Sequence, residues 1–489
     1  MRTLSLASVG HSAADKELLF LPALELAAKV RSAELSAREL VELSLERIEA
    51  LDGKLNAFVE LDAERALASA EQIRPGEERP FAGVPTAIKN NRAVQGLRLT
   101  HGAPLLEHFR APYDCAITRR LRSAGFIIVG TTALPEYGIL PVSEAHIFGP
   151  TRNPWDLERT PGGSSGGAAA AVAAGMLPVA HGNDGGGSIR IPAACCGLVG
   201  LKAQRGRVSL APELAHSLLV VDGMLTHTIG DCAALLDVLA GPETGDACWA
   251  PPPADSFAAL AQRPPARARI GYTTVSPIPE ASVDAVCAEA VERAAELLRE
   301  LGHEVVEVEP PWPREGLVER FGMLFSIHIA MSIDYSGQVA GREPQEQDME
   351  PMSYAIYSLA KRLSAIQGLA LETELLASMR SVAKLISGYD AILTPALAER
   401  PLALGALDTY ASEPLGTFTR SGYFTPFTAL FNASGHPAIT LPLLAGADGL
   451  PLAVQLAGRP ADEGTLLALG AQLEAATGWA ARRPPVALG

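Results

Sequence analysis

Two glycine- and serine-rich loops constrain this chain more than any other feature. The first is residues 162–167 (Gly-Gly-Ser-Ser-Gly-Gly) and the second is residues 185–188 (Gly-Gly-Gly-Ser). Between them lie an Ala-rich segment, which predicts a helix, and residues 177–180, which predict a short strand. Three glycines before Ser188 let successive backbone N–H groups turn toward one point, and such a nest can hold an oxyanion. The alternatives are a flexible turn or a phosphate loop, although no Gly-Lys-Ser or Gly-Lys-Thr follows.

Helices and strands are expected to alternate along the chain. A capping box at Ser36 and Glu39 begins a predicted helix that ends at Asp52-Gly53. Residues 280–388 are predicted to be mostly helical, apart from one short strand. This pattern predicts an α/β fold whose sheet takes strands from both halves of the chain. Strands are predicted at residues 81–89, 126–130, 269–272, 305–308, 391–394, 438–443 and 452–456.

Charge and apolar content exclude several classes of protein. The chain of 489 residues carries 55 Asp and Glu against 40 Lys and Arg, a net charge of −15, which opposes binding to nucleic acid or to an anionic membrane. Its most apolar stretch, residues 166–180, is shorter than the roughly 20 residues that cross a bilayer. No secretory signal is seen in residues 1–16, so we expect a cytoplasmic protein. The six cysteines form no C-x-x-C pair and are expected to be buried free thiols rather than zinc ligands.

The first loop satisfies G-x-S-x-G twice, centred on Ser164 and on Ser165. A nucleophile elbow of this kind follows a hydrophobic strand, whereas residues 153–161 are polar and contain two prolines. A serine nucleophile also needs a base, and His181 is the histidine nearest to Ser188 in sequence. An esterase that uses Ser164 or Ser165 with a histidine is therefore one open interpretation.

A lysine made neutral by burial is the other candidate base. Lys89 ends the apolar run 84–88, so its stem is expected to be enclosed while its amine reaches the end of a strand. Burial lowers the pKa of a lysine and leaves an amine that can accept a proton. A strand-end lysine that extends its amine to solvent is the alternative.

Lys89, the double-glycine serine loop and the Gly-rich loop together resemble the amidase signature family of Ser-cisSer-Lys hydrolases. The interval from Ser164 to Ser188 matches the family spacing, and residues 83–85, 161–167 and 184–192 fall in the family order. The likeness continues through residues 196–202, 205–209, 432–443 and 449–460 and covers nearly the whole chain. Residues 151–155, 179–184 and 479–484 look most like the 6-aminohexanoate-cyclic-dimer hydrolase, or nylon-oligomer, branch.

The resemblance implies an amidase signature fold, in which helices cover both faces of a mixed central sheet. It implies a single domain over residues 1–489, with a signature core at about 80–210 and a variable, substrate-shaping region at about 310–425. The expected reaction is hydrolysis of a small amide, anilide, nylon-oligomer-like amide or carbamate, without cofactor or metal. A small-molecule substrate is the expected partner, with no nucleic acid and no membrane, and a homodimer is compatible with this interpretation.

Site residues are carried over from the family by position. Ser188 would attack the carbonyl carbon, Ser164, preceded by a cis peptide, would pass the proton, and Lys89 would be the neutral base. The backbone of Gly185, Gly186, Gly187 and Ser188 would form the oxyanion hole. The remaining expected residues support these groups: Asp184 and Arg190 as a pair that braces the Gly-rich loop, and Ser165 as a residue that orients Ser164.

The chain also departs from the family pattern. Asn90 stands where an Asp is usual after the lysine, which favours a lower lysine pKa, and Gly185 replaces a larger residue. A partner-dependent subunit, like the amidotransferase component of the family, is a second open alternative. Tyr335, Tyr354 and Phe424 are proposed as walls of a substrate pocket, with core packing as the other interpretation of each.

Overall fold

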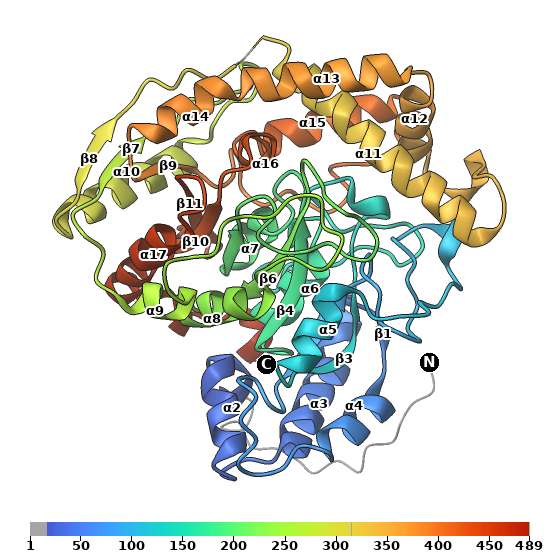
Figure 1. The fold of residues 1–489 in the computed structure, drawn as a ribbon, viewed down its shortest axis with the longest axis vertical. Coiled ribbons are helices and arrows are strands. Elements are labelled where there is room, and N and C mark those ends of the chain that lie inside the picture. The colour runs from blue at the N-terminus through green and yellow to red at the C-terminus, as the bar shows by residue number, and fades with distance from the viewer. Residues whose placement is uncertain (1–16, 314, 489) are drawn as a thin grey trace.

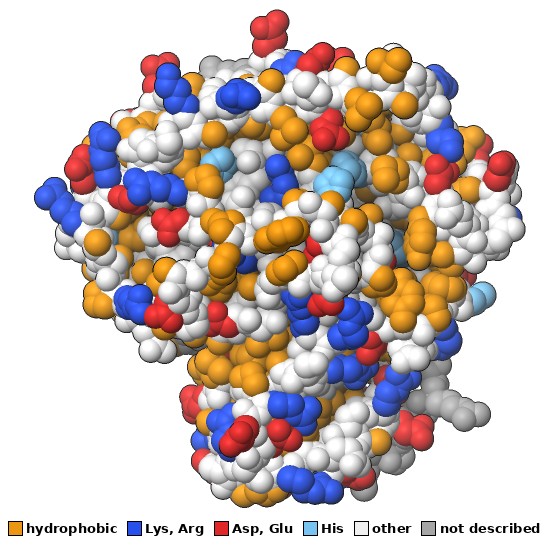
Figure 2. All heavy atoms as spheres, viewed as in Figure 1, with side chains coloured by type: hydrophobic (Ala, Val, Ile, Leu, Met, Phe, Trp, Pro, Cys, Tyr) orange, Lys and Arg blue, Asp and Glu red, His pale blue; other side chains and the backbone are white. Residues whose placement is uncertain are grey.

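The computed structural model describes residues 17–313 and 315–488, and Figure 1 shows their arrangement. The segment 1–16, on which the absence of a secretory signal was judged, lies outside the described residues. Acidic and basic side chains are interspersed over the face shown in Figure 2. All six cysteines are free, and five are buried as expected, but Cys248 is exposed.

A mixed sheet of eight strands lies at the centre of the fold, as the sequence predicts. It takes strands from both halves of the chain and is antiparallel except at one end, where β7 runs parallel to both of its neighbours. Its order is β4 (Val179–Asp184), β6 (Val221–Thr226), β5 (Val199–Lys202), β10 (Ala438–Ala445), β11 (Pro451–Gly458), β9 (Ala391–Pro395), β7 (Arg269–Tyr272) and β8 (Glu304–Glu307).

Three further strands form a separate small sheet in the order β1 (Phe58–Leu61), β3 (Ile127–Thr132) and β2 (Pro85–Lys89). This sheet lies against the edge strand β4: Thr86 Oγ1 donates to the Val179 carbonyl at 3.0 Å, and the Lys89 amide lies 3.3 Å from His181 Nδ1. The end of β2 is thereby held beside the end of β4, where the Gly-rich loop begins.

Helices flank the central sheet. In chain order they are η1 (Leu18–Phe20), α2 (Ala23–Arg31), α3 (Ala37–Leu55), α4 (Ala63–Ala70), η2 (Pro104–Leu106), α5 (Ala116–Ser123), η3 (Glu136–Gly138), α6 (Gly166–Ala173), α7 (Arg190–Cys196), α8 (Ile229–Leu239), α9 (Phe257–Gln262), α10 (Ala285–Glu300), α11 (Leu317–Ala340), η4 (Glu346–Asp348), α12 (Pro351–Ala360), α13 (Ala365–Ser378), α14 (Arg380–Ser387), α15 (Pro414–Phe424), α16 (Ala429–Ser434), α17 (Glu463–Thr477), η5 (Trp479–Ala481) and α18 (Pro485–Leu488).

The predicted capping box is present at the start of α3, where Ser36 and Glu39 exchange hydrogen bonds. The predicted end of this helix at Asp52-Gly53 is wrong. The helix continues to Leu55, and Asn56 ends it in the left-handed conformation at φ 52°. Asp52 contributes instead as a side-chain acceptor for the Ala57 amide at 2.7 Å.

The Ala-rich segment between the two loops forms α6, and every residue of this helix is buried. Small side chains allow this helix to pack closely against β4 and against β2, which carries Lys89. Gly163, in the loop before this helix, also permits close packing. A Cβ at Gly163 would lie 2.4 Å from the Val142 carbonyl oxygen. Both loops therefore depend on close backbone approach, which the lack of larger side chains permits.

Helices α11 to α15 form a layer at the top of Figure 1, above the loops that follow β4. This layer is the region of about 310–425 that was expected to vary and to shape the substrate site.

Candidate active site

Lys89, the last residue of β2, is fully buried. Its Nζ lies 2.7 Å from Ser164 Oγ and 2.7 Å from Asn183 Oδ1. Burial lowers the pKa of Lys89 well below its usual value and the charge of Arg92 lowers it further, whereas the charges of Asp184 and Asp222 raise it. An amine in this position favours the neutral form, which can accept a proton from the Ser164 hydroxyl.

Ser164 follows a cis peptide bond from Gly163, as the resemblance implies, and its side chain is buried beside Lys89. Residues 153–161 form a loop with only isolated bridges. The strand that a nucleophile elbow requires is therefore absent from this described segment.

Ser188 lies just before α7 and is partly exposed to a pocket. The Ser165 amide donates to the Ser188 carbonyl at 3.2 Å, so the two serine loops are joined by their backbones. The Ser165 side chain lies 3.3 Å from both the amide and the carbonyl oxygen of Asn183. Its recorded contacts therefore connect the first loop to β4 and Ser188, rather than reaching the Ser164 side chain that it was expected to orient.

Gly186 and Ser188 of the Gly-rich loop line the same pocket, and the set of available backbone N–H groups differs from the expected one at Gly187. Gly187 adopts φ 134°, and its amide already donates to Asp184 Oδ1 at 2.8 Å. The amides of Gly185, Gly186 and Ser188 have no recorded acceptor among residues 17–313 and 315–488. These three N–H groups are the ones left available to a ligand.

A buried ion pair holds this loop in place. Arg190 donates to both oxygens of Asp184 at 2.9 Å, and both side chains are fully buried. Burial opposes the charged form of Asp184, but the charge and hydrogen bonds of Arg190, together with Asn432, lower the pKa of Asp184 to about 2. The pair that was expected to brace the loop is thus present, and its contacts favour the ionised form of Asp184.

Three residues that the sequence did not single out complete this brace. Asn432 and Gln455 each accept a hydrogen bond from Arg190 at 2.6 Å. Thr428 donates to the Gly186 carbonyl at 2.6 Å. Two of these residues could have been noticed in the sequence. Asn432 lies in a segment that resembles the family, and Gln455 is a polar residue within an apolar predicted strand.

The contacts of His181 do not support a role as the base for a serine nucleophile. Its Nδ1 lies 3.3 Å from the Lys89 amide, and its Nε2 lies 3.7 Å from Asp222, which is paired with Arg92. Burial lowers the pKa of His181, although Asp222 opposes this shift. The recorded contacts of this histidine therefore reach neither Ser164 nor Ser188.

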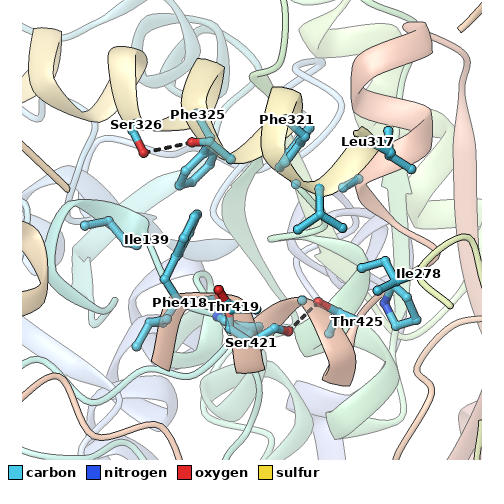
Figure 3. A pocket seen from close by; sticks show the side chains of 18 of the residues that line it. Ile139, Ile278, Leu317, Phe321, Phe325, Ser326, Phe418, Thr419, Ser421 and Thr425 are labelled. Atoms are coloured by element: carbon cyan, nitrogen blue, oxygen red, sulfur yellow. Dashed lines mark hydrogen bonds between the residues drawn. The ribbon is translucent and has the colours of Figure 1, made fainter. Parts of the chain in front are cut away.

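Ser188 and Gly186 line a pocket of about 320 Å³. Figure 3 shows this pocket from close by, with Phe321, Phe325 and Phe418 in its wall. Three phenylalanine rings form part of its wall: Phe325 stacks on Phe321 and on Phe418, with 5.9 Å between centroids in each pair. Its apolar lining comprises Ile139, Leu140, Pro141, Ile191, Ile278, Leu317, Val318, Phe321, Met323, Phe325, Leu359, Leu415, Phe418, Pro426, Ala429 and Leu430.

Hydroxyl groups in this wall donate hydrogen bonds to backbone carbonyls of their own helices. Ser326 donates to the Gly322 carbonyl at 2.8 Å, Ser421 to Phe418 at 2.6 Å, and Thr419 to Leu415 at 3.1 Å. Among the described residues of the lining, the one charged residue is Glu319, which is exposed. The pocket therefore offers apolar surface to a ligand, and its free polar groups are concentrated at the Ser188 end.

The three aromatic residues proposed as pocket walls do not line this pocket. Phe424 is fully buried in the core, Tyr354 packs against the core, and Tyr335 is 44% exposed. The pocket is lined instead by other residues of α11 and α15, among them Phe321, Phe325 and Phe418.

Neither a metal site nor a membrane span is evident in the part of the chain that the structure describes. No cluster of three or more His, Cys, Asp or Glu side chains is placed to hold a metal ion there. No helix there is long and apolar enough to cross a membrane.

Comparison with known proteins gives one consistent result. The family model described as Amidase matches residues 39–467. A putative amidase, AmiB2, of Mycobacterium tuberculosis is 40% identical over 480 residues, which cover 96% of this chain and 99% of the relative. The 6-aminohexanoate-cyclic-dimer hydrolase of Paenarthrobacter ureafaciens is 36% identical over 473 residues, covering 93% of this chain and 94% of that protein.

Solved structures agree with these sequence matches. A structure of 6-aminohexanoate cyclic dimer hydrolase superposes with a TM-score of 0.89 at 34% identity, covering 96% of this chain and 99% of that one. A bacterial aryl acylamidase of the amidase signature family gives a TM-score of 0.84 at 26% identity, with the same coverage.

Proposed function

The chain belongs to the amidase family and is an amidohydrolase, and from this premise we propose that it cleaves small amides through a serine acyl-enzyme. In this proposal Ser188 is the nucleophile, Ser164 passes the proton and Lys89 is the base. The observation that carries the proposal is that the buried Lys89 amine lies 2.7 Å from Ser164 Oγ. The loop that contains Ser164 is in turn joined to Ser188 by a backbone hydrogen bond.

The reaction begins with two linked proton transfers. The Ser164 hydroxyl gives its proton to Lys89 Nζ and takes the proton of the Ser188 hydroxyl, while Ser188 Oγ forms a bond to the carbonyl carbon. The proton then returns through Ser164 to the leaving nitrogen as the C–N bond breaks. Water, activated by the same two groups, hydrolyses the ester that remains on Ser188.

The developing negative charge on the carbonyl oxygen is stabilised by the available N–H groups of Gly185, Gly186 and Ser188. Donors placed in advance of the reaction need no reorganisation when the charge forms. The Gly187 N–H donates a hydrogen bond to Asp184 instead, so Gly187 contributes by holding the shape of the loop.

The proposed substrate is a compact, uncharged amide, anilide or carbamate with an apolar portion. The phenylalanine-lined wall supports this choice, since a charged group would lose its hydration against the three rings without gaining a partner from them. Relatives described as acting on a cyclic amide dimer and on aryl acylamides also support it.

We further propose that residues 1–489 act as one domain, because the eight-stranded sheet takes strands from Val179 to Gly458. The cytoplasmic location and the homodimer stay predictions.

Single substitutions in the full chain test the triad. Ser188→Ala, Ser164→Ala and Lys89→Ala should each lower kcat for 4-nitroacetanilide by at least about 1000-fold, because each removes a step of the proton path. The matched control is Lys54→Ala, which removes an exposed lysine at the end of α3.

The same set separates the two alternatives. Full activity of Lys89→Ala would contradict the proposal and support an esterase-like site that uses a histidine. A wild-type chain that stays inert until a partner subunit is added would support the amidotransferase-like alternative.

A further inference from the structure

The other polar group beside Lys89 Nζ is the side chain of Asn183 in β4. Asn183 Oδ1 lies 2.7 Å from Nζ, and its Nδ2 donates to Asn91 Oδ1 at 2.9 Å. Its backbone amide and carbonyl are both 3.3 Å from Ser165 Oγ. The side-chain amide is thereby held in one orientation, with its carbonyl oxygen toward Lys89.

This orientation matters because an amide oxygen accepts hydrogen bonds and has no proton to give. A neutral lysine amine has two N–H groups and one lone pair. When one N–H group points to Asn183 Oδ1, the lone pair can face Ser164 Oγ, the other side-chain atom recorded in contact with Nζ. Of the two neighbours of this amine, only Ser164 can then deliver a proton.

The charged groups around Lys89 are already matched to other partners. Asp184 is paired with Arg190, and Asp222 is paired with Arg92 and faces His181. No carboxylate is recorded in contact with Nζ within the described residues. A neutral acceptor therefore satisfies the amine without fixing it as an ammonium ion.

Resting on the proposed function, we propose that Asn183 is a positioning residue: it accepts a hydrogen bond from Lys89 Nζ, directs the lysine lone pair to the Ser164 hydroxyl, and stabilises the ammonium ion after the proton arrives. The proton comes from Ser164 and no other reactant is required. Asn183 itself neither gains nor loses a proton.

Two substitutions at this position have effects of opposite sign on the pH dependence of kcat/KM for 4-nitroacetanilide. Asn183→Asp places a carboxylate against the amine, which favours the ammonium form, so the acid limb should move to higher pH by at least about one unit. Asn91 can rotate its amide to donate to the second carboxylate oxygen. Asn183→Leu removes the acceptor, so the limb should move to lower pH while the plateau falls by about tenfold or more.

Asn91→Asp is the matched control for charge. It keeps an acceptor for Asn183 Nδ2 and adds a negative charge one hydrogen bond further from Lys89. Its acid limb should move by less than half as much as that of Asn183→Asp. Equal shifts in these two variants would overturn the proposal, because contact with the amine would then be unnecessary.

Thermal melts of each variant accompany the profiles. Folded Asn183 variants that lose activity without moving the limb would overturn the proposal and indicate a purely structural role. If one variant does not fold, the sign of the shift in the other decides. Activity that survives Lys89→Ala would instead overturn the proposed function, so the two failures are distinguishable.

Discussion

The floor and the wall of this pocket are built on different principles. The floor consists of the two serine loops and is fixed by buried polar contacts, among them the Asp184–Arg190 pair and the Lys89–Ser164 contact. The wall, from α11 and α15, is fixed by ring stacking and has its hydroxyls bonded to its own helix carbonyls. Substitutions in the floor should therefore affect folding and kcat, whereas substitutions in the wall should affect KM.

The largest expected effect comes from breaking the buried ion pair in the floor. Asp184→Ala leaves Arg190 buried without its partner, so it should lower the free energy of unfolding by about 3–5 kcal/mol. The measurement is urea denaturation. Glu304→Ala is the matched control, because it breaks the exposed Arg269–Glu304 pair, and it should cost less than about 1 kcal/mol. Equal losses in the two variants would contradict the comparison.

Gly187→Ala comes next and tests whether the shape of the floor controls the chemistry. A Cβ at this residue would lie 2.4 Å from Thr428 Oγ1, and φ 134° disfavours any side chain. The backbone must shift and would displace the neighbouring N–H groups of Gly186 and Ser188, so kcat should fall by about 100- to 1000-fold, the usual effect of losing one oxyanion donor.

Gly186→Ala separates steric from conformational effects in the same loop. A Cβ at Gly186 would meet only the ring of Phe321, at 3.5 Å, and no positive φ is required. We expect it to change kcat by less than about tenfold. A loss equal to that of Gly187→Ala would contradict this account of the loop.

The smallest expected effect lies in the wall. Phe321→Ala removes one ring of the stack and should raise KM for an aromatic amide by about tenfold, or about 1.4 kcal/mol, with kcat within about threefold. Tyr335→Ala, at an exposed position outside the pocket, should leave both constants unchanged. A fall in kcat without a rise in KM would show that the wall takes part in the chemistry.

The sequence predicted the frame of the fold but not all of its strands. Apolar runs located β7 at its observed bounds and β9, β10 and β11 within a few residues. Strands β1, β5 and β6 were not predicted. Strand β1 has an exposed end and β5 contains a glycine, so neither has a clear alternating pattern.

The candidate site likewise contains residues that could be predicted from the sequence and residues that could not. The serine loops and Lys89 were predicted because their residue types and spacing carry the signal. Asn183 lay inside a noted segment, but its contact with Lys89 depends on how β2 and β4 lie side by side. Phe321 and Phe418 meet through Phe325 only after α11 packs near α15, and nothing local in the sequence specifies that meeting.

The most direct test of the floor as a catalytic unit is to label the full chain with a serine-directed fluorophosphonate and to locate the adduct by peptide mass spectrometry. The account predicts an adduct on Ser188 in the wild type and at least about 100-fold slower labelling in Lys89→Ala. An adduct on Ser164 or Ser165, formed at the same rate with or without Lys89, would contradict it.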